Sequence, residues 1–109
     1  MGATSERVTL ELHGFLAQRL EGLGRPRGTR VLINVPASQG ESVGTLLARL
    51  TAADDRYALL YDPTADRLPE HVEAVLNDRV LDLQGGLAAR LSDGDVLSFL
   101  PAHAGGAAG

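Results

Sequence analysis

Alternating apolar and polar positions near the start of the chain predict a β-strand over residues 8–12. Valine or leucine fills every second position there, which is typical of a strand with one buried face. Leucines at helical spacing predict a short helix over residues 15–22, and a loop containing a proline follows over residues 22–28. Residues 30–35 are apolar at nearly every position, so we expect a strand in the middle of a sheet.

The clearest helical pattern lies in the middle of the chain and predicts one main helix. Its apolar stripe at the i, i+3, i+4, i+7 spacing consists of Val43, Leu46, Leu47 and Leu50. Ser42 precedes the stripe and suits the N-cap, because its side-chain oxygen can accept a hydrogen bond from an unpaired backbone N–H. We expect the helix to end near residues 53–55, and residues 54–70 carry the weakest pattern in the sequence.

The last third of the chain predicts a hairpin and a final strand. Residues 72–76 and 79–83 flank Asn77-Asp78, two residues that tolerate positive φ and favour a tight hairpin turn. Ser-Asp-Gly-Asp at residues 92–95 is a turn signal, and the alternation behind it predicts a strand over residues 95–100. A proline follows this strand and is expected to end it, because proline has no N–H for the ladder.

Composition is that of an ordinary globular protein and excludes several kinds of site. The 109 residues suffice for one domain, and 44% of them are hydrophobic and 22% charged. A net charge of −4 argues against a nucleic-acid partner. There is no cysteine, which excludes disulfides, thiolate metal sites and a cysteine nucleophile. Lysine is also absent, so the protein offers no side-chain amine for acylation.

Neither a membrane partner nor a metal site is expected. No stretch approaches a membrane span and the N-terminus has no signal-peptide pattern, so a cytoplasmic location is the default. His13, His71 and His103 lie far apart in the sequence and show no metal-ligand spacing. The acidic pairs at residues 54–55 and 93–95 lack the other ligands of a calcium loop, so a helix end and a turn explain them better.

A small basic cluster consists of Arg25, Arg27 and Arg30. A solvated loop is the common explanation of such a cluster, and docking to an acidic partner is the alternative.

The chain ends in small residues that can carry chemistry through the backbone. Pro101 is followed only by Ala, His and Gly, with the pair Gly105-Gly106 near the end. A frayed terminus is the usual meaning of such a tail. However, a diglycine arm can also enter a tunnel too narrow for side chains. Here it follows a turn, an apolar strand and a proline, so we expect a domain over residues 1–101 and a flexible tail over residues 102–109.

Three motifs and the diglycine pair resemble those of a known protein family. They are Val75-Leu76-Asn77-Asp78-Arg79-Val80, Leu91-Ser92-Asp93-Gly94-Asp95-Val96 and Phe99-Leu100-Pro101. They resemble the MoaD/ThiS family of ubiquitin-like small sulfur-carrier proteins, and the likeness covers most of the chain but is weakest over residues 54–70. Both the resemblance and the order of elements imply an α+β β-grasp fold, a mixed sheet of four to five strands with one main helix packed across it.

The resemblance implies a carrier and not an enzyme. In this family the terminal glycine carboxylate is adenylated by an activating enzyme, which uses ATP and Mg²⁺, and is then converted to a thiocarboxylate that donates sulfur. By resemblance Gly106 would supply the carboxylate, no side chain would be catalytic and the chain would bind no cofactor. The implied partners are the adenylating enzyme and the large subunit of a synthase such as molybdopterin synthase, which places the carrier in molybdenum cofactor biosynthesis.

The C-terminus departs from the family pattern in two places. The family's proline pair appears here as Pro101-Ala102. Gly106 is not terminal, because Ala107-Ala108-Gly109 follows it. The resemblance therefore implies that a peptidase, such as a JAMM-type zinc metalloprotease, cuts between Gly106 and Ala107. Direct use of Gly109, or an inactive full-length protein, are the alternatives.

Alternation along the final strand predicts a docking face for partner enzymes. If Leu97 and Phe99 point into the core, the residues between them point outward. The proposed docking residues are Val96, Leu100, Pro101 and, on the hairpin, Leu81 or Val80. The alternative is that Leu100 is covered by its own chain.

Two further functions remain open at this point. A ubiquitin-like modifier would use the same activated glycine to join lysines of other proteins, although without lysine it forms no side-chain-linked polymers of itself. An inert β-grasp interaction module would make no use of the tail.

Overall fold

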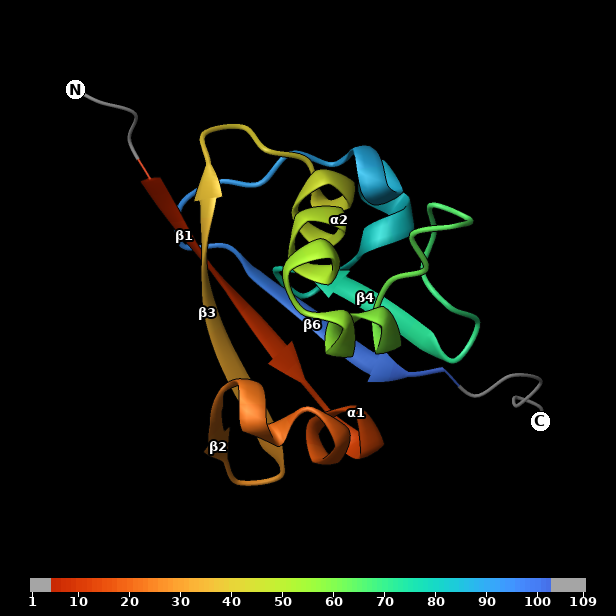
Figure 1. The fold of residues 1–109 in the computed structure, drawn as a ribbon. Helices are drawn as coiled ribbons and strands as arrows, with labels where there is room; N and C mark the ends of the chain where they lie inside the picture. The colour runs from red at the N-terminus through yellow and green to blue at the C-terminus, as the bar shows by residue number, and fades with distance from the viewer. Residues whose placement is uncertain (1–4, 103–109) are drawn as a thin grey trace.

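A six-stranded mixed sheet, in the order β2-β3-β1-β6-β4-β5, carries the fold. The computed structural model describes residues 5–102 of the chain (Figure 1). The strands are β1 (Ser5–Leu12), β2 (Arg25–Arg27), β3 (Arg30–Ser38), β4 (Val72–Leu76), β5 (Arg79–Val80) and β6 (Val96–Pro101). The α-helices are α1 (Gly14–Arg19) and α2 (Val43–Ala53), and short 3₁₀ helices cover Glu21–Leu23 (η1), Asp55–Leu59 (η2), Leu81–Gln84 (η3) and Gly86–Ala88 (η4).

Strand β6 lies inside the sheet although it comes last in the sequence. It runs parallel to β1, with Leu10 opposite Leu97, and antiparallel to β4, with Ala74 opposite Phe99. On the far side of β1, strand β3 pairs antiparallel over eight residue pairs. Helix α2 packs across one face of this sheet (Figure 1). This is the β-grasp arrangement expected from the sequence.

The core lies between α2 and one face of the sheet. The strand side chains that face the helix are fully buried in β1 and β6, namely Val8, Leu10, Leu12, Leu97 and Phe99. The predicted helical stripe is buried against them. Ser42 is the N-cap, as predicted, because its Oγ accepts a hydrogen bond of 3.1 Å from the Thr45 N–H. None of the helices between residues 5 and 102 is long and apolar enough to cross a membrane.

The hairpin turn is confirmed, but the strand expected over residues 79–83 is wrong beyond Val80. Asn77 and Asp78 adopt φ values of 52° and 69°. The chain then leaves the sheet and starts η3, because Leu81 turns into the core and is only 2% exposed. The Gln84 Nε2 group donates to the Arg79 and Leu76 carbonyls at 2.8 and 3.1 Å, which ties this turn back to the hairpin.

Strand β2 lies where the sequence predicted a loop, so the sheet has six strands instead of four to five. Its hairpin with β3 turns at Gly28-Thr29, and Gly28 adopts a φ of +64° that favours glycine. Gly24 allows the close approach that starts β2, because a Cβ there would lie 2.2 Å from the Leu32 carbonyl oxygen.

The weakly patterned stretch from residue 54 to residue 70 packs against the core through three buried side chains. Leu60 is fully buried, Tyr61 is 3% exposed and Tyr57 is 7% exposed. The Tyr61 hydroxyl donates a hydrogen bond to the Asp66 carboxylate, and this contact, together with burial, raises the pKa of Tyr61 to about 12. Asp62 accepts from the Thr64 and Ala65 N–H groups, which forms a compact turn.

A largely buried ion pair joins the loop before α2 to the helix itself. The Glu41 side chain is 5% exposed, and its carboxylate accepts from Arg49 at 2.9 and 3.1 Å and from the Ser38 N–H at 3.0 Å. The hydrogen bonds from Arg49 lower the pKa of Glu41, against the opposing effect of burial. A carboxyl group whose folded-state pKa is lowered stabilises the fold above its unfolded pKa.

We expect Glu41→Gln to lower the free energy of unfolding at pH 7 by about 1–2 kcal/mol, because charge-assisted hydrogen bonds are weakened. The stabilisation by Glu41 is lost as the pH falls through its lowered folded-state pKa. Urea unfolding at pH 7 and pH 3 measures this, and the difference between wild type and variant should shrink at pH 3. The exposed Glu73→Gln is the control. An equal deficit at both pH values would contradict the assignment.

Candidate functional site

The candidate site is the point where β6 ends and the C-terminal segment begins. Hydrogen bonds from both neighbouring strand ends fix this point. On one side the His13 N–H donates to the Phe99 carbonyl at 3.1 Å, and on the other the Ala102 N–H donates to the His71 carbonyl at 2.8 Å. Ala102, the last residue described, is therefore held at the end of a strand that is paired on both edges.

Four residues surround this point, and we call them the exit collar: Gly14, Phe15, His71 and Pro101. Gly14 adopts a φ of +61°, and a Cβ on it would lie 2.7 Å from the Pro101 Cγ. The Phe15 ring is 5.8 Å from the His71 imidazole, and the His71 Nε2 lies 3.0 Å from the Leu59 carbonyl oxygen, to which it can donate. Phe15 is 37% exposed, so the collar presents apolar surface to solvent.

The face of the sheet away from α2, which we call the open face, also reaches the exit. The alternation predicted for β6 is confirmed, because Leu97 and Phe99 are fully buried while Val96, Ser98 and Leu100 are half-buried on the other face. Leu100 lies opposite Glu73 of β4. Leu100 is therefore neither fully covered by its own chain nor fully exposed. It directly precedes Pro101 of the exit collar.

A carboxylate sits in the middle of the open face. Glu11 of β1 accepts a hydrogen bond of 2.9 Å from the Ser98 hydroxyl and forms an ion pair with Arg30 of β3. The His13 Nε2 lies 3.4 Å from the same carboxylate. Although burial opposes ionisation of Glu11, the contacts with Ser98, His13 and Arg30 lower its pKa. This network ties β6, β1 and β3 together beneath the exit.

The structure changes the predicted docking set on the hairpin. Leu81 is buried, so its predicted place in an exposed patch is wrong, and Val80 is the hairpin residue that reaches the surface, at 39% exposure. Sequence reasoning gave Phe15 no role in the site. The signal was available, because Phe15 lies just outside the Leu16 and Leu20 stripe of its helix and so cannot share the buried face.

The residues predicted to carry the chemistry lie outside the described residues. They are Gly105, Gly106 and, at the cleavage point, Ala107, and their roles stay predictions, as does the boundary between domain and tail. His103, for which no metal-ligand role was expected, also lies outside the described residues. Between residues 5 and 102, no group of three or more His, Asp or Glu side chains is arranged to hold a metal ion.

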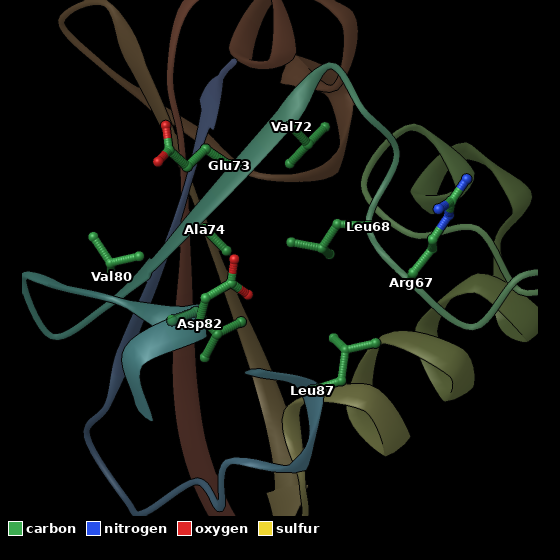
Figure 2. Close-up of a pocket in the computed structure, with 9 residues that line it drawn as sticks. Arg67, Leu68, Val72, Glu73, Ala74, Val80, Asp82 and Leu87 are labelled. Atoms are coloured by element: carbon green, nitrogen blue, oxygen red, sulfur yellow. The ribbon is translucent and has the colours of Figure 1, made fainter. Parts of the chain in front are cut away.

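A cavity of about 290 Å³ lies on the β5 side of β4. Figure 2 shows Leu68 and Leu87 extending toward it, with Val72 and Ala74 on the adjacent strand. Its remaining lining comes from Arg67, Glu73, Val80, Leu81 and Asp82. Six of the nine lining residues are aliphatic, and the other three, Arg67, Glu73 and Asp82, are charged.

Comparison with known proteins decides the family. The family model described as "ThiS family" matches residues 31–106, which is more than half of the chain. The chain belongs to the ThiS family. The sulfur carrier protein CysO of Mycobacterium tuberculosis is 33% identical to it over 72 residues, covering 64% of this chain and 77% of that protein.

Solved structures agree on the fold. Small archaeal modifier protein 1 of Haloferax volcanii superposes with a TM-score of 0.66 at 18% identity, covering 90% of this chain and 99% of that one. Urm1 of Trypanosoma brucei gives a TM-score of 0.64 at 19% identity, covering 94% and 97%. The resemblance drawn from the sequence motifs is thus confirmed: this chain belongs to the family of ubiquitin-like small sulfur-carrier proteins.

We expect Gly14→Ala to destabilise the protein more than Gly28→Ala, by about 1 kcal/mol or more. Both glycines have a positive φ near 60°, but only Gly14 faces Pro101, whereas nothing lies within 4 Å of a Cβ at Gly28. Urea unfolding measures the difference, and amide chemical shifts of His71 and Ala102 should move only in the Gly14 variant. Equal losses of stability would show that the Pro101 contact does not hold the exit.

Proposed function

We propose that this protein is a sulfur carrier whose mature C-terminus is Gly106 and whose terminal carboxylate is converted to a thiocarboxylate. The observation that carries the proposal is the family match, which extends from the fold into the tail and stops at residue 106. The likeness to a sulfur carrier at 33% identity supports it. The exit collar supports it as well, because it fixes the root of an arm that bears no large side chain.

The reaction takes place in two steps at the terminal carbon. A carboxylate oxygen attacks the α-phosphorus of ATP, pyrophosphate leaves and an acyl adenylate forms. Sulfide (HS⁻) then attacks the carbonyl carbon and forms a C–S bond, while the bond from that carbon to the phosphate oxygen breaks and AMP leaves with the bonding electrons. Loss of the proton on sulfur gives the thiocarboxylate. The partner enzyme binds the ATP and Mg²⁺. This chain contributes the carboxylate and its position, which concentrates the reacting group at the partner's site.

Removal of Ala107-Ala108-Gly109 must precede adenylation in this scheme, because only then is the Gly106 carboxylate free. We propose a JAMM-type zinc metalloprotease for this cut. For the destination of the sulfur we propose molybdopterin-type cofactor synthesis with a synthase large subunit, because the sequence motifs resemble the MoaD/ThiS family. Thiamine synthesis, cysteine synthesis and tRNA thiolation are the alternatives.

A second candidate function is conjugation to other proteins through the same glycine. The likeness of the fold to small archaeal modifier protein 1 favours it. Activation would be identical, but a lysine amine of another protein would attack the acyl adenylate, or a thioester made from it, and form an amide.

The mass of the mature protein from its own cells tests the proposal. We expect a chain that ends at Gly106 and gains the mass difference between a sulfur and an oxygen atom, and a zinc chelator should leave the last three residues in place. A chain shortened to Gly105 is the matched control and should not be modified. A thiocarboxylate on the intact Gly109 form would overturn the trimming step, and isopeptide adducts would favour the modifier.

For the docking surface we expect Leu100→Gln to reduce kcat/KM for adenylation by about tenfold or more, because a half-buried apolar residue beside the tail is suited to be an interface anchor. Leu83→Gln, the same change at an 85% exposed leucine of η3 outside the proposed docking set, should change it less than about twofold. Melting temperatures of both variants show whether each still folds. Equal effects on adenylation would remove Leu100 from the docking surface.

A further inference from the structure

Strand register brings the three arginines of the basic cluster to the open face. Arg25 lies opposite Leu32, and Arg27 lies opposite Arg30. Residues directly opposite one another in a sheet point to the same face. Leu32 in turn lies opposite Glu11, which lies opposite Ser98 of β6. We call Arg25, Arg27 and Arg30 the arginine edge; its side chains share the face that carries Leu100.

The arginine edge lies at the same end of the sheet as the exit collar. Strand β6 is parallel to β1, and Leu12, near the end of β1, pairs with Phe99 on one side and with Val31 on the other. The turn between β2 and β3 therefore lies at the same end of the sheet as the end of β6, with β1 between β3 and β6. Figure 1 shows β2, α1 and the end of β6 in the same lower part of the molecule.

The charges of the arginine edge are only partly neutralised within the protein. Arg30 pairs with Glu11, but Arg25 and Arg27 take part in none of the ion pairs found between residues 5 and 102. All three arginines are exposed. Arg27 directly faces Arg30 across the hairpin, and like charges in that position destabilise a sheet. An unpaired cationic edge thus persists in a chain whose net charge is −4.

We infer that the arginine edge binds an acidic surface of the protein that takes up the tail. This inference rests on the proposed function and names the chemistry of its partner. Guanidinium groups bind carboxylates in a fork geometry, and charge complementarity around an apolar contact speeds and orients docking. Leu32 and Leu100 supply apolar surface on the same face, next to the charges.

An acidic protein surface fits this face better than a nucleic acid does. Nucleic-acid binding draws on several phosphate contacts, and here one of three arginines is already occupied by Glu11. The half-buried leucines offer nothing to a phosphate backbone, whereas an interface between proteins has an apolar centre and a polar rim.

The arginines have one competing explanation, which is protection of an edge strand. Charged residues and proline on an edge prevent pairing with other chains, and β2 has the sequence Arg-Pro-Arg. The two explanations differ in outcome. Protection predicts that replacing the arginines causes self-association, whereas docking predicts a monodisperse variant with weaker binding to an acidic surface.

The test titrates the isotope-labelled full chain with poly-L-glutamate at low ionic strength and follows amide chemical shifts. We expect shifts on β2, β3 and the end of β6, and about a fivefold or greater loss of affinity in the double variant Arg25→Gln, Arg27→Gln. The control removes the same charge elsewhere, with Arg79→Gln and Arg90→Gln, and should lose less than about twofold. Replacing Arg27 alone with Gln should not lower the melting temperature, because this substitution removes the repulsion between Arg27 and Arg30.

Three outcomes would overturn the inference. The first is shifts spread over all arginines, or equal losses in the two double variants. The second is tighter binding of a single-stranded oligonucleotide of matched charge at the same residues, which would assign the edge to nucleic acid. The third is self-association of the Arg25, Arg27 variant in gel filtration. Because the titration uses no enzyme, its failure is distinguishable from a failure of the proposed adenylation.

Discussion

The pairing of β6 between β1 and β4 is the interaction on which the rest of the structure depends. It buries Leu97 and Phe99 against α2 and at the same time carries the chain to the edge of the molecule at Ala102. Although β6 is the last strand in the sequence, the arrangement of the sheet depends on it. Pairing on both edges gives the end of β6 a fixed position.

The same arrangement divides the molecule into two faces with separate tasks. One face is closed by α2 and supplies the burial that stabilises the fold. The other is left open, and it holds the Glu11 network, the half-buried Leu100 and the arginine edge. Strand β6 ends at the same end of the sheet as the arginine edge. Under the proposed function, a partner that binds the chain beyond Ala102 would therefore also contact the open face.

The sequence predicted those parts of the fold in which the local pattern of residues agrees with their burial in the tertiary structure. The stripe of α2, the Ser42 cap and the alternation of β6 were all predicted correctly, because each is set by neighbours in the chain. The predictions that failed depend on distant contacts. Strand β2 forms since Gly24 lets the chain approach Leu32, and Leu81 leaves the hairpin for the core; no local pattern reveals either. The strand register likewise places Arg25 and Arg27 at the same end of the sheet as the exit, which their spacing in the sequence did not show.

The parallel pairing of β1 and β6 has a mechanical consequence. The described part of the chain begins at one end of this pair and finishes at the other (Figure 1). A force that draws the two ends apart slides the strands along each other and loads their hydrogen bonds together instead of opening them one at a time. Traction on the C-terminal end of β6 would therefore be resisted by all the hydrogen bonds between β1 and β6 acting together.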